Sequence, residues 1–192
     1  KSKFDISLIS EAKKLGFSYK QIGRCFNLEE HQVRGLRKKF GIFPVVKQID
    51  TLAGEWPAKT NYLYLTYGGE YDDILYPTTT NNNCNGNTDG NGNSGKGVIV
   101  LGAGPYRIGS SVEFDWGTVN MVYSLRENGI KNISVINCNP ETVSTDFDIP
   151  DRLYFEELTL ERVLDICEKE KPSGLVACVG GQSANNLISK LI

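Results

Sequence analysis

The chain has 192 residues, of which 40% are hydrophobic and 23% are charged, so it is long enough for one folded domain or slightly more. No apolar run is long enough to span a bilayer, and five cysteines without CxxC spacing beside a single histidine disfavour a disulfide framework and a zinc site. Residues 1–49 carry 11 Lys and Arg against 4 Asp and Glu, whereas residues 50–192 carry 10 against 19. This asymmetry predicts two domains, and scattered reduced thiols favour a cytoplasmic protein.

Residues 4–41 are predicted to form three short helices. Apolar residues recur at helical spacing through this stretch, and glycines follow the first and the third repeat. Two capping-box pairs predict the starts of the second and third helices, namely Ser18 with Gln21 and Asn27 with Glu30. The apolar positions of the third helix are Val33, Leu36 and Phe40.

The third predicted helix also carries a run of basic residues, namely Arg34, Arg37, Lys38 and Lys39. A helix-turn-helix would present such residues to DNA phosphates, which makes a nucleic-acid-binding module one alternative function. We favour a solvent-exposed basic face, because no basic arm flanks the helices and the rest of the chain is acidic. A second alternative is a purely structural or oligomerisation module that binds no ligand.

The middle of the chain is predicted to connect two domains. Residues 44–60 show little periodicity, whereas Tyr62–Tyr67 alternates and predicts a short strand. Residues 78–97 are rich in Thr, Asn, Gly and Ser, and they contain too few apolar residues to offset the entropy cost of ordering, which predicts a disordered loop or linker. The resulting divisions are a helical domain at 1–60, a connecting segment at 61–96 and an α/β domain at 97–192.

From residue 97 onward, strands and helices are predicted to alternate. The strands are expected at 98–101, 133–137 and 175–179. Asp115 is expected to cap a helix that runs to Asn128, and Thr159 to cap a helix that Pro172 ends. Three residues should face the sheet from the first of these helices: Val119, Val122 and Leu125. Strands joined by helices predict an α/β fold with a parallel sheet.

The glycine turn after the first strand differs from a dinucleotide-binding turn. Gly102 and Gly104 match the first two glycines of GxGxxG, but Arg107 occupies the third position and glycine returns only at Gly109. The second strand is followed by Asn-Cys-Asn-Pro, without the acidic residue that would bind a ribose, and no Walker A ending is present. These differences disfavour NAD, FAD and P-loop nucleotide binding.

One cation and several carboxylates follow the first two strands instead. Arg107 can bind a planar anion through two hydrogen bonds, or it can pair with Glu113 or Glu141 as a structural salt bridge. The pattern favours neither interpretation over the other. Asp146, Asp148 and Asp151 are interpreted as polar loop residues and caps.

Four motifs of the α/β domain resemble carbamoyl phosphate synthetase, large chain, at the opening of its second half. They are GAGPYRIGSSVEFD at 102–115, NCNPETVSTD at 137–146, DRLYFE at 151–156 and GGQ at 180–182. Residues 8–42 are similar to the oligomerisation domain of that family. The resemblance departs at the Asn-rich loop and at Ser183-Ala184, where the family often has Thr-Pro.

The resemblance implies a small helical domain, a low-complexity linker and an incomplete, parallel-sheet, Rossmann-like pre-ATP-grasp domain. In that family a ligase forms carbamoyl phosphate from bicarbonate and glutamine-derived ammonia, with two ATP, Mg²⁺ (or Mn²⁺) and K⁺. The resemblance further implies a glutamine amidotransferase partner, contact with the other synthetase half and an oligomer. It implies that neither nucleic acid nor a membrane is a partner. The chain begins at Lys1 without Met, which suggests a fragment, so a mitochondrial targeting segment outside it stays open.

The resemblance also implies roles for individual residues. Three would lie along a path for carbamate: Arg107, Glu113 and Glu141. Seven would shape the surrounding loops: Gly102, Gly104, Gly109, Asn139, Gly180, Gly181 and Gln182. No catalytic or metal-binding residue is expected within this chain, because the ATP-grasp domain that would carry the nucleotide and metal ligands is not part of it.

Overall fold

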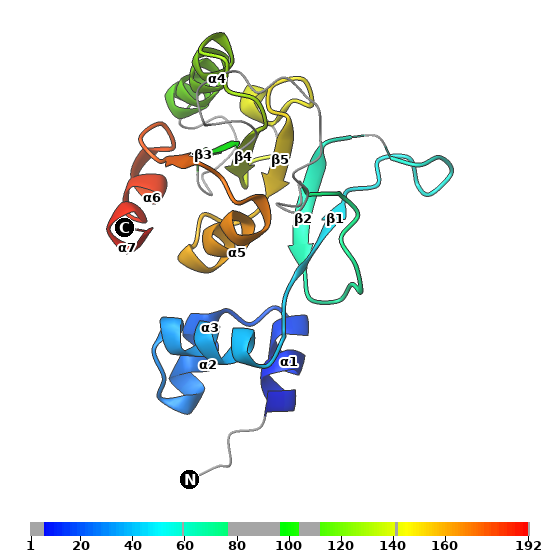
Figure 1. Ribbon diagram of the computed structural model, residues 1–192, viewed down its shortest axis with the longest axis vertical. Coiled ribbons are helices and arrows are strands. Elements are labelled where there is room, and N and C mark those ends of the chain that lie inside the picture. The colour runs from blue at the N-terminus through cyan, green and yellow to red at the C-terminus, as the bar shows by residue number, and fades with distance from the viewer. Residues whose placement is uncertain (1–5, 59, 77–96, 104–111, 141, 192) are drawn as a thin grey trace, which may run out of the picture. The chain divides into compact units, whose positions relative to one another are not determined.

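The computed structural model describes residues 6–58, 60–76, 97–103, 112–140 and 142–191 (Figure 1). The helices are α1 (Ile6–Lys14), α2 (Tyr19–Phe26), α3 (Glu30–Lys39), α4 (Val112–Glu127), α5 (Leu160–Glu170), α6 (Gly181–Asn185) and α7 (Ile188–Leu191), with a 3-10 helix η1 (Val143–Thr145). The strands are β1 (Val45–Gln48), β2 (Tyr62–Thr66), β3 (Val98–Leu101), β4 (Ile133–Asn137), β5 (Arg152–Phe155) and β6 (Gly174–Val176).

The chain divides into two compact units. We call Lys1–Lys47 with Leu65–Asp73 the helical unit, and Gln48–Tyr64 with Ile74–Ile192 the sheet unit. The Asn-rich loop predicted at 78–97 falls almost wholly outside the described residues. Among the helices that the structure describes, none has both the length and the apolar character needed to cross a bilayer.

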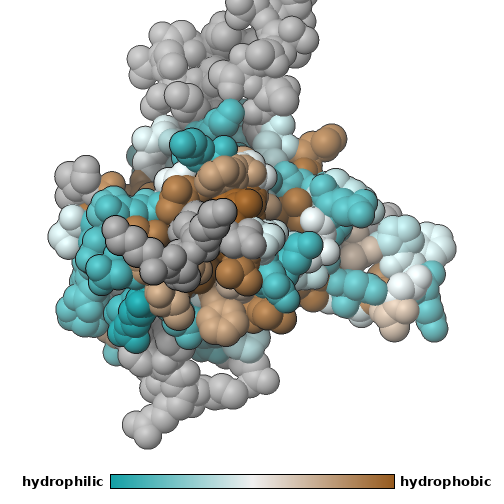
Figure 2. Space-filling view, turned by 90° about the horizontal axis from the view of Figure 1, so that it is seen from below, coloured by the Kyte–Doolittle hydropathy of each residue, from teal (hydrophilic) through white to brown (hydrophobic). Residues whose placement is uncertain are grey.

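The helical unit contains the three helices that the sequence predicts. The capping box of α2 is confirmed. The backbone N–H of Gln21 donates to Ser18 Oγ at 3.2 Å, and the backbone N–H of Ser18 donates to Gln21 Oε1 at 2.8 Å. The core of the unit is formed by Ile9, Tyr19, Ile22 and Val33. Several large apolar side chains of this unit stay exposed, namely Leu8, Leu15, Phe17, Phe40 and Phe43. Figure 2 shows apolar surface among hydrophilic residues.

The predicted start of α3 is wrong by two residues. Asn27 takes the left-handed backbone conformation, with φ of 54°, and thereby ends α2 instead of opening α3. Asparagine tolerates this conformation better than most residues. The capping pair of α3 is Glu29 with Gln32, whose Oε1 accepts from the Glu29 amide at 2.9 Å.

The buried face of α3 also differs from the prediction. Phe40 is 49% exposed, whereas Arg37 is fully buried. The Arg37 guanidinium donates to the Ile42 carbonyl at 2.7 Å and lies over the rings of Tyr19 and Phe43. One of the four basic residues proposed to contact DNA therefore belongs to the core, which argues against the helix-turn-helix interpretation.

A parallel sheet forms the centre of the sheet unit. Within this unit the strand order is β2-β5-β4-β3-β6, and every adjacent pair is parallel. The predicted strands at 98–101 and 133–137 are confirmed, and β6 is shorter than predicted. Neither β1 nor β5 was expected, because each mixes polar and apolar residues over only four positions, unlike the all-apolar run of β3.

Helices cover both faces of this sheet (Figure 1). Val100, Val135 and Leu153 share one row and one face, where they join a cluster with Val122 of α4. Val119 and Leu125 pack against the same cluster, as predicted. The next row, which includes Tyr154, faces the opposite way, and the Tyr154 hydroxyl contacts Glu170 of α5. Strands covered on both faces read as continuous apolar runs, and this explains why Val98–Leu101 was recognisable.

Candidate functional site

The candidate site lies at the carboxyl edge of the parallel sheet. Gly102 follows β3, Asn137 ends β4, and Gly180 follows β6, so the topology brings these residues to the same edge. Ligand sites of open α/β sheets form at this edge, because the loops that leave the strands meet there. The neighbouring strands β3, β4 and β6 therefore place the predicted loop residues close to one another.

Asn137 joins two loops at this edge. Its side chain is fully buried, its Nδ2 donates to Ser144 Oγ at 3.1 Å, and its Oδ1 accepts from the Asn139 amide at 2.9 Å. A Cβ on Gly102 would lie 2.9 Å from Asn137 Nδ2, so glycine is needed for β3 to run so close to this amide. In the sequence, Asn137 stands where a ribose-binding acid is absent and opens the motif NCNPETVSTD, but neither pattern predicts that it joins two loops. The available signal for that role is a polar residue at the end of an apolar strand.

Asp115 has a different role from the one predicted. Because α4 begins at Val112, Asp115 lies within its first turn and cannot be its N-cap. Its buried carboxylate instead accepts from the backbone N–H groups of Val143 at 3.1 Å and Ser144 at 2.9 Å. Two charge-assisted hydrogen bonds therefore connect α4 to η1.

Two glycines allow the last loop to approach the sheet. A Cβ on Gly180 would lie 2.2 Å from the Gly102 carbonyl oxygen and 2.5 Å from that of Leu101. Gly181 has a φ of +70°, and its Cβ would lie 2.9 Å from the ring of Phe114. Both positions thus need glycine on steric grounds. The adjoining Gln182 is exposed and donates to Asn186 Oδ1 at 2.8 Å.

The predicted anion-binding residues are only partly described. Arg107 and Glu141, together with Gly104 and Gly109, lie outside the described residues. Glu113 is exposed on the first turn of α4, two residues before Asp115. The structure thus locates Glu113 at the carboxyl edge but does not test its pairing with Arg107.

Cys138, which directly follows β4, is a potential nucleophile at this edge. Its Sγ lies 3.9 Å from the Ala103 carbonyl oxygen, and burial raises the pKa of its thiol. A raised pKa keeps the thiol protonated at neutral pH, whereas a nucleophile needs the thiolate. Among the residues described, no group of three or more His, Cys, Asp or Glu side chains could hold a metal ion.

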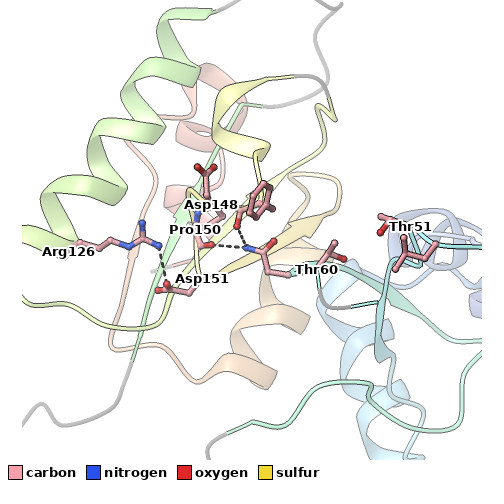
Figure 3. Close-up of a pocket in the computed structure, with 9 residues that line it drawn as sticks. Thr51, Thr60, Arg126, Asp148, Pro150 and Asp151 are labelled. Atoms are coloured by element: carbon pink, nitrogen blue, oxygen red, sulfur yellow. Dashed lines mark hydrogen bonds and ion pairs between the residues drawn. The ribbon is translucent and has the colours of Figure 1, made fainter. Parts of the chain in front are cut away.

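A cavity of about 640 Å³ lies at the opposite, amino edge of the sheet (Figure 3). Its polar lining groups bind one another: Arg126 pairs with Asp151 at 3.0 Å, and Asn61 donates to the Phe147 and Pro150 carbonyls at 3.0 and 2.7 Å. Asp151 also accepts from the Ile133 amide at 2.7 Å, in agreement with its interpretation as a loop cap. These contacts hold loops together, so we do not assign the site to this cavity.

Comparison with known proteins identifies relatives for the whole chain. Residues 94–192 match the family model described as carbamoyl phosphate synthase preATP-grasp domain. The chain is 52% identical to mitochondrial carbamoyl-phosphate synthase [ammonia] of Rattus norvegicus, over 93% of this chain and 11% of the relative. It is 52% identical to the arginine-specific carbamoyl phosphate synthase large chain of Eremothecium gossypii, over 99% of this chain and 16% of the relative.

A third relative is the carbamoyl phosphate synthase large chain of Pyrococcus furiosus, which is 53% identical over 96% of this chain and 15% of its own length. The chain therefore spans 11% to 16% of the length of these relatives. The similarity extends over the helical unit as well as the sheet unit, since the matches cover nearly all of the 192 residues.

Proposed function

The chain belongs to the carbamoyl phosphate synthase pre-ATP-grasp domain family, and on this basis we propose that it is part of an enzyme that forms carbamoyl phosphate. The proposed reaction is ATP-dependent and uses bicarbonate and glutamine-derived ammonia. The match of residues 94–192 to the family carries the proposal, supported by more than 50% identity to two synthase large chains. The chain would contribute to the half of the enzyme that phosphorylates carbamate.

The proposed cofactors, ATP with Mg²⁺ (or Mn²⁺) and K⁺, would be bound mainly by other parts of the parent protein. The described residues do not fit these groups, because they offer neither a cluster of carboxylates for a metal ion nor an acidic residue for a ribose at the end of β4. The proposed partners are a glutamine amidotransferase and the other synthetase half, and the exposed apolar residues of the helical unit support an oligomer.

Within the parent enzyme, we propose that Arg107, Glu113 and Glu141 line a path for carbamate. Carbamate is a small planar anion, so a guanidinium can bind it through two hydrogen bonds. It decomposes in water, so a closed path would protect it between two reaction steps. The neighbouring carboxylates would keep Arg107 from binding the anion too tightly. The position of Glu113 at the carboxyl edge of the sheet supports this role.

Substitution of Arg107 by Ala in the full-length enzyme tests the path. We expect the number of ATP molecules hydrolysed per carbamoyl phosphate formed to rise about tenfold or more, because carbamate would be lost before its phosphorylation. The matched control is Arg126→Ala, which removes an arginine from the opposite edge of the sheet and should leave this ratio unchanged. An unchanged ratio in Arg107→Ala would refute the path.

A further inference from the structure

Three side chains of the sheet unit join the first turn of α4 to the loop after β4. Asp115 accepts from the backbone N–H groups of Val143 and Ser144 at 3.1 and 2.9 Å. Asn137 donates to the hydroxyl of the same Ser144 at 3.1 Å. Ser144 is thus held through its main chain from α4 and through its side chain from β4. We call Asp115, Asn137 and Ser144 the latch.

The latch is buried, which makes its geometry restrictive. Asn137 and Ser144 are fully buried, and Asp115 is 8% exposed. Water competes little for hydrogen bonds in a buried environment, and a charged acceptor strengthens such bonds further. A carboxylate that accepts from two successive backbone N–H groups also determines the orientation of that backbone. The start of α4 and the start of η1 therefore cannot shift independently of each other.

We propose that Asp115 and Asn137 are positioning residues for the carbamate path, an inference that rests on the proposed function. In the sequence, Arg107 and Glu113 precede Asp115, and Glu141 lies between Asn137 and the backbone that Asp115 contacts. The latch thus connects the two segments of chain on which the three path residues occur. Its role is to keep these segments at a constant separation, without contact between the latch and the anion.

If the hydrogen bonds of the latch are weakened, we expect carbamate to be lost before it is phosphorylated, while ATP hydrolysis continues. A displacement of about 1 Å in a group that positions a substrate can lower a rate about 100-fold. In an enzyme with a reactive intermediate, a path that no longer closes admits water, so ATP is consumed without product. A residue that only stabilises the fold would instead lower ATP hydrolysis and carbamoyl phosphate formation in the same proportion.

The experiment is Asp115→Asn in the full-length enzyme. The amide keeps the size of the carboxylate and one acceptor oxygen, but its NH₂ group opposes one of the two backbone N–H groups. We expect the ATP hydrolysed per carbamoyl phosphate formed to rise about fivefold or more. The matched control is Asp151→Asn, because Asp151 also accepts from a backbone amide, that of Ile133, at the opposite edge of the sheet. This control should leave the ratio unchanged.

A second variant, Ser144→Ala, keeps the backbone N–H that Asp115 binds and removes the hydroxyl that Asn137 contacts. We expect a smaller rise in the same ratio, about twofold. It provides the test if Asp115→Asn does not yield folded enzyme. In an Arg107→Ala background, neither latch variant should raise the ratio further, because the path is already open.

The outcomes separate this inference from the function on which it rests. If Arg107→Ala raises the ratio and both latch variants leave it unchanged, the positioning role is wrong and the path stands. If the latch variants lower ATP hydrolysis and product formation equally, the latch is only structural and the inference is again overturned. If Arg107→Ala itself has no effect on the ratio, the proposed path fails, and the inference fails with it.

Discussion

Arg37 in the helical unit and Asn137 in the sheet unit are both fully buried polar side chains, but they occupy opposite kinds of position. Arg37 lies at the centre of its unit, over the rings of Tyr19 and Phe43. Asn137 lies at the edge of an aliphatic sheet core, where strands end and loops begin. The helical unit thus packs a cationic side chain at its centre, whereas Asn137 of the sheet unit lies where a strand passes into a loop.

The difference follows from the size and layering of the two units. A small helical unit has few apolar residues to bury, so the long stem of an arginine fills space while its guanidinium stacks on aromatic rings. Lys13 is used in the same way, because its ammonium lies over the rings of Tyr19 and Tyr67. A parallel sheet covered on both faces has no such need, since its strands supply aliphatic side chains in continuous rows. Charge in the sequence therefore does not by itself predict exposure.

The largest effect is expected from Gly180→Ala, which tests how closely the carboxyl edge of the sheet is packed. The added Cβ would meet two backbone carbonyl oxygens at 2.2 and 2.5 Å and the Cβ of Ala184 at 2.8 Å. None of these atoms can rotate away, so we expect a loss of about 3–4 kcal/mol in the free energy of unfolding, measured by urea denaturation.

The control for this substitution is Gly174→Ala, at the first residue of β6. A Cβ there has no heavy atom within 4 Å, and Gly174 has no positive φ. Little change in stability is expected. Equal stability of the two variants would mean that the carboxyl edge of the sheet relaxes around an added methyl group, and that the close packing around Asn137 does not constrain this edge.

The next effect concerns the helical core itself. Arg37→Met keeps most of the aliphatic stem but removes the guanidinium that donates to the Ile42 carbonyl at 2.7 Å. Because that carbonyl loses its donor and two rings lose a cation, we expect a loss of about 2–3 kcal/mol in unfolding free energy by urea denaturation. Lys39→Met, at the exposed end of α3, should have little effect. A fully stable Arg37→Met protein would show that the apolar stem alone carries the stabilisation.

The smallest effect is expected for a polar group inside the sheet unit. The Tyr154 hydroxyl contacts Glu170 and lies 3.1 Å from the Tyr76 hydroxyl. Tyr154→Phe removes these hydrogen bonds and should lower the unfolding free energy by about 1–1.5 kcal/mol at pH 7, measured by urea denaturation. Tyr123→Phe, at an exposed position of α4, is the matched control.

The unfolding free energies of the wild type and of Tyr154→Phe should also differ in their dependence on pH. Burial, and then the charge of Glu170, raise the pKa of Tyr154 above its ordinary value. Above pH of about 10 an unfolded tyrosine loses its proton while the folded one retains it, so stability falls as the pH rises. Between pH 10 and 11 the unfolding free energy of Tyr154→Phe should fall less steeply than that of the wild type. Parallel curves would contradict the buried, protonated hydroxyl.

Local patterns explain which features could be predicted. The predicted N-caps Ser18 and Thr159 are both confirmed. Each side chain accepts from a backbone N–H within the first turn of its own helix, that of Gln21 in α2 and that of Arg162 in α5. The continuous apolar runs at β3 and β4 predicted their strands. The start of α3 could not be predicted in the same way, because Asn27 with Glu30 fits the capping pattern but Asn27 ends α2, and the true N-cap, Glu29, is not a typical capping residue.

The candidate site was predictable only in part. Gly102 and Gly180 were recognised as loop residues from the sequence, but the reasons for glycine there are contacts with Asn137 and with the end of β3. Asp115 was assigned to its own helix, because sequence spacing cannot show a partner 28 residues away. No local sequence pattern therefore predicts the latch.

The sequence by itself determined the α/β class, the N-caps of α2 and α5, two central strands and the family, because these depend on hydrogen bonds and periodicities within a few residues or on residue identity. Only the tertiary structure decided that Arg37 is buried, that β5 lies between β4 and β2, and that Asp115 holds η1. Each of these outcomes joins residues from different elements. The free energies of these contacts depend on which surfaces pack together in the fold. Patterns within a few residues of the sequence do not show this packing.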